Sequence, residues 1–286
     1  MNGQWFINSV SDGSIYFLVA LGFAFIYRTA RFFDFSFAAL LAVAPYAVIS
    51  WREHGGLPAI LAALLGVLST TVIAVLVDLF LFGRLRKHAA SNGTMLLVSL
   101  GVFLVLRNTL SAIWSDEAIV LGGQSDPTYP MLGGRITEVQ TISIIIAVLA
   151  GVGATVTLRT TLLGRWVNAI ASDPELAQAV GIPVSRVLGV LYGAAAIATG
   201  IAGVLLARDV GLTPNLGFRP FLFAVVAVVL AGSFASLRVA FGCFLVAVVQ
   251  NYVLWKLGPA WQEGLIFLVF LVVVIARSIR KGLVVS

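Results

Sequence analysis

The stretch Pro58–Phe82 reads PAILAALLGVLSTTVIAVLVDLFLF and carries one charged residue, Asp78, in 25 positions. A helix needs about 20 apolar residues to cross a hydrocarbon core about 30 Å thick, so this stretch is long enough to span a membrane. The whole chain of 286 residues has the same character, with 60% hydrophobic residues, 10% charged residues and a mean hydropathy of +1.05. Soluble domains carry about 25% charged residues. This chain therefore has too little polar surface to face water on all sides.

Eight further apolar stretches are separated by charged or turn-forming residues, and each is a candidate membrane helix by hydropathy. The seventh of the nine is short enough to be re-entrant, so we expect about 8–9 transmembrane helices. The sequence thus predicts an all-α integral membrane protein, a polytopic bundle in a single transmembrane domain over residues 1–286. The candidate spans are Ile7–Ile26, Phe32–Ile49, Pro58–Phe82, Thr94–Trp114, Thr141–Leu158, Arg186–Leu206, Pro220–Phe234, Val239–Trp255 and Gln262–Ala276.

The distribution of Lys and Arg predicts which side each loop faces, because cytoplasmic loops carry an excess of both. With the N-terminus outside, twelve of the 18 Lys and Arg fall in inner loops, five fall in outer loops, and Arg107 lies within a span. We therefore expect the N-terminus outside and the C-terminus inside. The basic residues are scattered singly at helix ends, which indicates membrane anchoring rather than nucleic-acid binding. The first span lacks a preceding basic region, which favours a retained helix over a cleaved signal.

The longest outer segment, Ser115–Gln140, is polar and rich in turn-forming residues, as expected for a connection or a substrate contact. The longest inner segment, residues 159–185, contains a helix start. Asp173 can cap a helix whose first position is Pro174, and Gly181 followed by a proline ends it. Leu176, Ala179 and Val180 share one face of this short helix. That face either packs on the chain's own helices or the lipid interface, or inserts into a soluble cytoplasmic partner.

Three stretches, in order along nearly the whole chain, carry a family resemblance. The first span contains Asn8-Ser9-Val10-Ser11-Asp12-Gly13-Ser14-Ile15-Tyr16, and the fourth contains Ser99, Gly101 and Asn108. The inner segment runs from Leu163-Gly164-Arg165 to Gly181-Ile182. Together they resemble the permease subunits of branched-chain amino acid ABC importers, of the shorter, first-permease type.

The resemblance implies a bacterial inner-membrane permease that forms a heterodimer with a second related permease. It also implies two cytoplasmic ATPases, which bind ATP so that this chain needs no cofactor of its own, and an extracytoplasmic substrate-binding protein. Membrane lipid is the remaining partner. Within the segment 159–185, a coupling helix would dock into an ATPase. The residues carried over to this role are Gly164, Arg165, Asp173, Pro174, Leu176, Ala177, Val180 and Gly181.

Two departures from the family pattern leave the substrate open. The second span has Asp34-Phe35-Ser36-Phe37-Ala38 where the family usually has N-F-A-H/Q-G. The later glycine-rich turn, G-G-x-G-S-x-x-G in the family, is Ala231-Gly232-Ser233-Phe234-Ala235-Ser236-Leu237-Arg238. A branched-chain amino acid is the expected substrate, while urea, short amides and aromatic or other carboxylic acids stay open.

Polar residues within the spans are candidates for the translocation path, because ionisable groups in lipid tend to face protein or water. Asp12 would cap backbone or line the path. Asp34 either pairs with Arg31 three residues before it or acts in the path or its gate. Arg107 would face the interior, pairing with Asp12 or with a substrate carboxylate. The full candidate set is Asn8, Asp12, Asp34, Arg107 and Asn108.

Asp78 is expected to have a structural role, reaching toward the basic run Arg84-Leu85-Arg86-Lys87. The chain has neither a G-x-x-x-x-G-K-[ST] phosphate-binding loop nor an H-E-x-x-H motif, and its single cysteine excludes an internal disulfide. An enzymatic function has no group of residues to support it. The alternative from another class is a secondary transporter that couples ions or protons through Asp34 or Arg107.

Overall fold

The structure is a computed structural model that describes residues 3–88, 90–120, 127–131, 133–231 and 236–258, with residues 261, 264, 268, 271, 272 and 275. Most of the ninth expected span, Gln262–Ala276, lies outside the described residues. So do residues 232–235 of the segment 231–238, which stands where the family has its glycine-rich turn. The C-terminal residues 276–286, on which part of the expected orientation rests, lie outside them as well.

The described residues form helices almost throughout, which confirms the all-α membrane class. Each of the first eight expected spans overlaps a helix or a continuous helical run. Six helices or runs are long and apolar enough to cross a membrane, and α10 is a shorter apolar helix. The helices are α1 Gln4–Ala30, α2 Ser36–Glu53, α3 Ala59–Val77, η1 Asp78–Phe82, α4 Gly83–Lys87, α5 Asn92–Trp114, α6 Glu138–Thr160, α7 Leu162–Ser172, α8 Pro174–Ala179, α9 Val184–Val210, α10 Phe218–Ala231 and α11 Ser236–Leu257.

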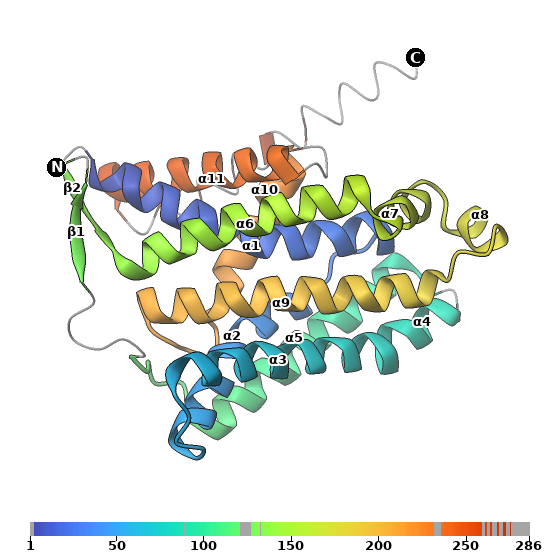
Figure 1. The fold of residues 1–286 in the computed structure, drawn as a ribbon, viewed down its shortest axis with the longest axis horizontal. Coiled ribbons are helices and arrows are strands. Elements are labelled where there is room, and N and C mark those ends of the chain that lie inside the picture. The colour runs from blue at the N-terminus through green and yellow to red at the C-terminus, as the bar shows by residue number, and fades with distance from the viewer. Residues whose placement is uncertain are drawn as a thin grey trace.

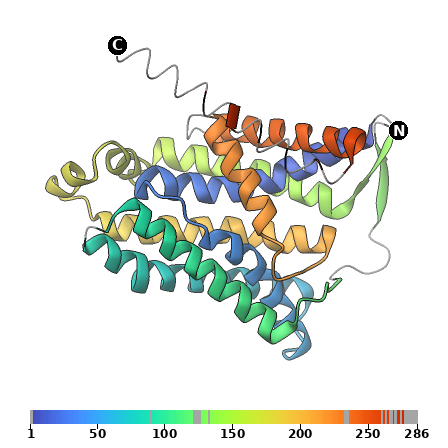
Figure 2. The same ribbon diagram turned by 180° about the vertical axis from the view of Figure 1, so that it is seen from behind.

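Helix α1 lies at the centre of the bundle. It packs against α6, α9, α10 and α11. The long helices α1, α6, α9 and α11 run along the long axis of the molecule, whereas the shorter α10 crosses the bundle obliquely (Figures 1 and 2). Every residue from Ile15 to Ala24 is buried. The outer surface of the bundle is apolar, and this central position keeps the middle of α1 largely away from lipid. The helix is therefore placed to carry polar groups that lipid would not tolerate.

Small residues on α9 let it approach its neighbours closely. A methyl group added at Gly203 would collide with the backbone oxygen of Leu41 on α2. On α1, a methyl group at Gly22 would lie 2.9 Å from the backbone oxygen of Ala195 on α9. Membrane helices gain association energy from such close packing, since lipid supplies no hydrophobic driving force between them. The glycines at positions 22 and 203 thus serve helix packing.

Two local features differ from the expected plain span and plain connection. The run from α3 to α4 contains a π-helical turn, η1, which begins at Asp78. The segment Ser115–Gln140 contains an antiparallel hairpin of β1 Thr128–Met131 and β2 Gly134–Thr137. The hairpin lies at the end of the bundle opposite α7 and α8 (Figure 1). These two ends carry the two candidate sites.

The close contact of α9 with α2 predicts a stability difference between two glycines of the same helix. Gly203→Ala places a methyl group against backbone and should cost about 1–3 kcal/mol, as overpacking does. Gly193→Ala meets no atom closer than 3.7 Å and should leave stability unchanged or improved. Thermal melting of the detergent-solubilised protein measures both. Equal melting temperatures for the two variants would contradict the packing of α9 described above.

Candidate functional site

A polar cavity of about 630 Å³ lies at the hairpin end of the bundle. Its walls come from the first turns of α1, the end of α9, the loop and first turn leading into α10, and the end of α11. Two of the candidate path residues, Asn8 and Asp12, line it. The full lining is Asn8, Asp12, Ile15, Tyr16, Gln140, Leu206, Asp209, Val210, Gly211, Thr213, Asn215, Leu216, Arg219, Pro220, Phe223, Gln250, Asn251 and Leu254.

Hydrogen bonds between α1 and α11 hold the polar side chains of this cavity. The Asn251 amide donates to the Asp12 carboxylate at 2.8 Å and also to the backbone oxygen of Ala247 at 3.1 Å. One turn along α1, the Tyr16 hydroxyl donates to the Gln250 side-chain oxygen at 2.6 Å. Sequence reasoning missed Gln250 and Asn251. The signal was available, because two adjacent amides within an otherwise apolar span are costly in lipid.

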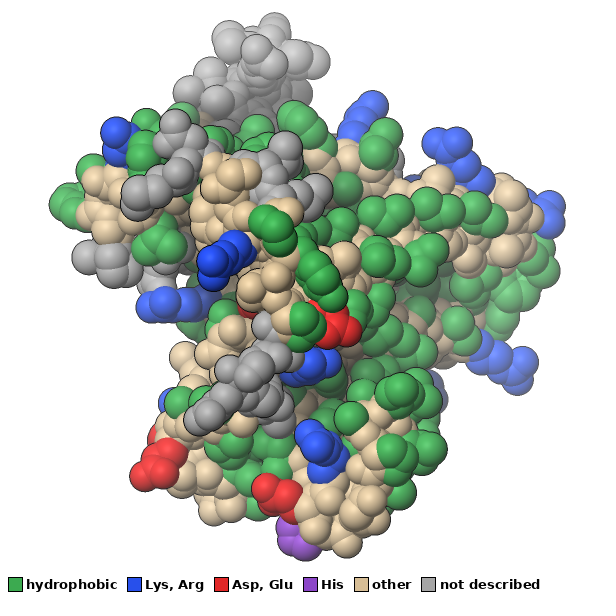
Figure 3. Space-filling view, turned by 60° about the vertical axis from the view of Figure 1, so that its left-hand side comes forward, with side chains coloured by type: hydrophobic (Ala, Val, Ile, Leu, Met, Phe, Trp, Pro, Cys, Tyr) green, Lys and Arg blue, Asp and Glu red, His purple; other side chains and the backbone are tan. Residues whose placement is uncertain are grey.

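The cavity combines charges of both signs with an apolar wall. Asp12 and Asp209 supply carboxylates, and Arg219 supplies a guanidinium. Acidic and basic side chains both lie on the end of the molecule that faces the viewer in Figure 3. Ile15, Leu206 and Phe223 are among the apolar lining residues. Such a site can receive a small solute that carries an ammonium group, a carboxylate and an apolar side chain.

Asp34 lies elsewhere, fully buried in the link between α1 and α2. Its Oδ1 accepts hydrogen bonds from the backbone N–H of Ser36 at 2.9 Å and from the Ser36 hydroxyl at 2.5 Å. Its Oδ2 accepts one from the Tyr192 hydroxyl at 2.8 Å. The Arg31–Asp34 ion pair expected from the sequence is wrong. Arg31 has a left-handed backbone (φ 58°) that ends α1, so the helical three-residue spacing does not apply.

The polar contacts around Asp34 extend to a buried ion pair. Asp78 binds the Arg86 guanidinium at 2.6 Å, in agreement with the structural role expected for Asp78. The same guanidinium lies 5.9 Å from the centre of the Tyr192 ring, over its face. Phe37 and Phe82 pack around that ring. This cluster joins the α1–α2 link, η1, α4 and α9. Asp34 does not line the polar cavity.

Arg107 and Asn108 lie on α5, away from the polar cavity. The expected Arg107–Asp12 pair is wrong, because Asp12 is bound by Asn251 and α5 packs chiefly against α2. Arg107 is half-buried, and its Nε atom is buried with no hydrogen-bond partner among the described residues. Asn108 is exposed on the same helix face as Gly101 and Leu104. An apolar helix therefore presents a polar group on its outer face.

At the opposite end of the bundle, α7 and α8 form the segment expected to couple to a partner. Arg31 fixes its position, since the Arg31 guanidinium donates to the backbone oxygens of Ala171 and Ser172 at 3.0 and 2.9 Å. Gly164 permits the tight turn from α6 to α7, where an added methyl group would collide with the backbone oxygen of Leu158. The segment is therefore held rigidly to the end of α1.

Helix α8 has the capping expected from the sequence. The Asp173 carboxylate accepts from the backbone N–H groups of Glu175 and Leu176 at 2.9 and 3.0 Å, and Pro174 is the first helical residue. Gly181 follows the helix with φ +88°, a backbone that favours glycine. These contacts confirm the predicted start and stop.

The predicted apolar face of α8 points away from the bundle. Leu176 is 62% exposed and Val180 is 70% exposed, whereas Ala177 is buried. Packing of this face on the chain's own helices is therefore wrong, while packing on the lipid interface and insertion into a cytoplasmic partner both stay open. Figure 1 shows α8 projecting beyond the ends of the long helices. The chain thus holds an apolar surface outside the bundle on a capped, anchored helix.

Residues 6–274 match the family described as the permease component of branched-chain amino acid transport systems. The high-affinity branched-chain amino acid transport system permease protein BraD of Pseudomonas aeruginosa is 22% identical over 291 residues, covering 96% of this chain and 93% of BraD. The corresponding permease protein LivH of Escherichia coli (strain K12) is 24% identical over 242 residues, covering 80% of this chain and 78% of LivH.

A sugar permease also matches. The ribose import permease protein RbsC of Bacillus subtilis is 28% identical over 232 residues, covering 80% of this chain and 69% of RbsC. The solved structure of PsaBC from Streptococcus pneumoniae in complex with Fab aligns with a TM-score of 0.47 and 14% identity, covering 94% of this chain and 89% of that one.

The buried cluster at Asp34 predicts a measurable coupling between two residues. Tyr192→Phe removes one of the hydrogen bonds to a fully buried carboxylate and should cost about 1–3 kcal/mol of stability. In an Asp34→Asn background the same change should cost less, because the charge that the hydroxyl serves is gone. Thermal melting in detergent measures the cycle. The control Tyr252→Phe, on a half-exposed ring of α11, should leave the melting temperature unchanged.

Proposed function

This chain belongs to the permease components of branched-chain amino acid transport systems, and from that premise we propose that it forms the translocation path of an ATP-driven importer. It is a membrane permease of an ABC transporter and not an enzyme, and it is a multi-pass protein of the bacterial inner membrane. The ion- or proton-coupled secondary transporter is not favoured by this family membership.

The exposed face of α8 carries the proposal of ATP-driven transport. The permease has no nucleotide-binding motif, so hydrolysis has to occur on a separate protein. An exposed Leu176 and Val180 on a helix fixed by Asp173 and Arg31 are suited to insertion into an apolar groove. We therefore assign residues 159–185 as the coupling segment, docking one of two cytoplasmic ATPases that bind the ATP. The remaining residues complete a single transmembrane domain.

The outer face of α5 supports a second permease as partner. An arginine or asparagine facing hydrocarbon near the middle of a helix costs several kcal/mol, on the order of 3 kcal/mol for arginine. The buried Nε of Arg107 has no hydrogen-bond partner in the part of the chain that the structure describes, and Asn108 lies on the exposed face of α5. A related permease packed on this face, in a heterodimer, would remove both groups from lipid. The two residues would then lie at the edge of a path shared by the two subunits.

Sidedness follows from the positions of the basic residues. Arg28, Arg84, Lys87 and Arg159 lie at or near the end that carries α7 and α8, and by the positive-inside rule this supports a cytoplasmic position for that end. The N-terminus would then be outside and the polar cavity would open toward an extracytoplasmic binding protein. With α2, α10 and the C-terminal segment included, about 8–9 helices would cross or enter the membrane.

The charges of the cavity favour an amino acid as the solute. A zwitterion needs an anionic and a cationic partner, which Asp12 or Asp209 and Arg219 would provide. The apolar wall would receive a branched aliphatic side chain. Urea and amides lack charges for these groups, and a carboxylic acid without an ammonium group would leave the carboxylates unused. Branched-chain amino acids are therefore the proposed substrates.

Substitution on α8 tests the coupling assignment. Leu176→Asp places a charge on the docking face and should reduce transport by tenfold or more while leaving the chain inserted, since a buried unpaired charge costs several kcal/mol. Gly181→Pro, which alters the turn that ends α8, should also reduce transport. The measurements are ATP-dependent uptake and ATP hydrolysis in vesicles that contain the complex of both permeases and both ATPases.

The matched control is Gln178→Asp, which adds the same charge to another face of α8. It should retain most of the uptake. If Leu176→Asp transports normally, or if the permease purified with its co-expressed partners brings no ATPase with it, α8 is not a coupling helix.

Substitution in the cavity tests the substrate assignment. Asp12→Asn removes a charged hydrogen-bond partner, worth about 1.5–3 kcal/mol, and should lower leucine uptake about tenfold or more. Glu53→Gln, an exposed carboxylate at the same end outside the cavity, should not change it. Unlabelled isoleucine and valine should compete with leucine, and urea should not. Competition by urea or by a simple carboxylic acid at the same concentration would overturn the assignment.

A further inference from the structure

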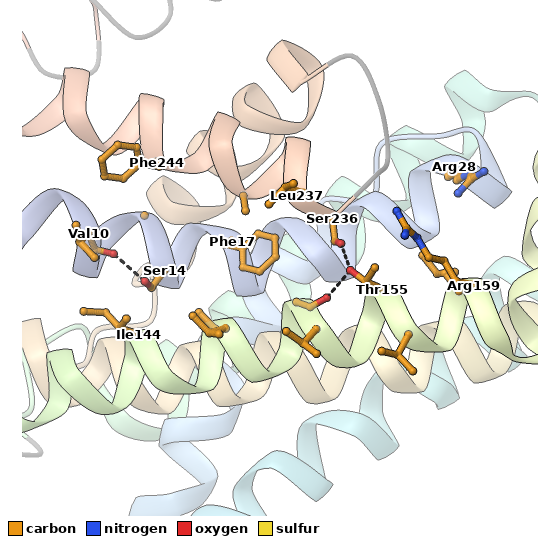
Figure 4. A pocket seen from close by; sticks show the side chains of 18 of the residues that line it. Val10, Ser14, Phe17, Arg28, Ile144, Thr155, Arg159, Ser236, Leu237 and Phe244 are labelled. Carbon is orange, nitrogen blue, oxygen red and sulfur yellow. Dashed lines mark hydrogen bonds between the residues drawn. The ribbon is translucent and has the colours of Figure 1, made fainter.

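A second, larger groove of about 900 Å³ runs along the side of the bundle between α6 and α11, with α1 at its floor (Figure 4). On α6, the lining residues recur every three or four positions from Ile144 to Arg159 and so form one face of the helix. Val148 is 60% exposed and Leu237 of α11 is 82% exposed. The groove therefore opens sideways, toward the lipid rather than toward either end of the bundle.

The polar atoms inside this groove already have partners. The Ser14 hydroxyl donates to the backbone oxygen of Val10 at 2.7 Å. The Thr155 hydroxyl donates to the Gly151 oxygen at 2.7 Å and is hydrogen-bonded to the Ser236 hydroxyl, as the dashed lines in Figure 4 show. The rest of the wall is apolar. Between Ser14 and Ser236 the groove thus offers a solute few unpaired polar groups, whereas an alkyl chain fits such a surface.

One end of the groove is basic. Arg28 and Arg159 lie together at the end nearest α7 (Figure 4), and the Arg28 guanidinium donates to the Asn168 side-chain oxygen at 2.7 Å. Arg159 is exposed to solvent at the last turn of α6. Basic pockets between membrane helices on the cytoplasmic side bind anionic lipid headgroups. This end of the groove therefore complements a phosphate.

The length of the groove matches one lipid molecule. From Ile144 to Arg159, α6 rises about 22 Å at 1.5 Å per residue. One leaflet, headgroups included, is half of a bilayer about 40–45 Å thick, or about 20–22 Å. A phospholipid with its phosphate at Arg159 would thus reach Ile144 with the ends of its acyl chains.

We propose that this groove is a binding site for one anionic phospholipid of the cytoplasmic leaflet. Its acyl chain lies along α1, α6 and α11, and its phosphate binds Arg159 and Arg28. Because Arg28 is bonded to Asn168 of α7, the headgroup touches the segment that precedes α8. The site rests on the proposed sidedness of the permease and not on the identity of the solute it transports.

The experiment compares two lipids on delipidated permease purified with its partner subunits. Phosphatidylglycerol should raise the melting temperature more than phosphatidylcholine of the same chains, and native mass spectrometry should detect it bound to this subunit. Arg159→Gln should weaken phosphatidylglycerol binding about fivefold, the loss expected for one basic residue at a membrane surface, and should remove the preference over phosphatidylcholine. Lys87→Gln, an exposed basic residue at the same end outside the groove, should leave the preference intact.

A pair of tryptophan variants tests the apolar wall. Val148→Trp fills part of the groove and should reduce the binding of both lipids, while Val72→Trp, on an exposed position of α3, should not. Both positions are exposed, so neither substitution should disturb the packing of the protein. Arg159→Gln tests the headgroup contact independently of these two variants.

Equal binding of the two lipids by the unmodified protein would overturn the proposal. Loss of the second permease in Val148→Trp, with lipid binding unchanged, would instead identify the groove as a protein interface. Neither outcome depends on ATPase copurification or amino acid uptake, which test the proposed function.

Discussion

The close packing of α9 against α1 and α2 fixes the rest of the structure. Backbone atoms of these helices approach each other at Gly22 and Gly203, where even one methyl group would collide with a carbonyl oxygen. Water drives apolar surfaces together in soluble proteins, but lipid does not, so such contacts supply much of the energy that orders a membrane bundle. They place α1 at the centre. Both cavities and the anchored end of α7 are built on that helix.

Buried and half-buried polar residues in this bundle belong to two kinds of environment. Around Asp34 and Asp78, the side-chain partners are residues of the same protein, and aromatic rings surround them. Such a cluster specifies how the helices meet and has little to offer a passing solute. Asp12 and Gln250 are also hydrogen-bonded, but they line a cavity. How deep a polar residue lies within its predicted span does not tell which environment it has. Its position relative to the cavity does.

Local features were predictable from the sequence, and contacts between distant helices were not. The helical segments follow from hydropathy, and the start of α8 follows from Asp173 and Pro174, because both depend on residues close together in the chain. The predicted Arg31–Asp34 pair is wrong because Arg31 itself has a left-handed backbone that ends α1. The Arg107–Asp12 pair failed because α5 packs on α2, a fact of topology that no spacing reveals. Gln250 became a candidate only when α11 was placed beside α1.

A single helix, α9, connects the proposed docking surface on α8 to the polar cavity. α9 begins at Val184, directly after the turn that ends α8, and ends at Val210, which lines the polar cavity. Its 27 residues span about 40 Å, the thickness of a bilayer with its headgroups. Close backbone packing makes α9 stiff against α1 and α2, so a displacement imposed at α8 would move along its axis rather than be absorbed by bending. The same glycines that order the bundle would thus allow a displacement at one membrane face to be transmitted to the other.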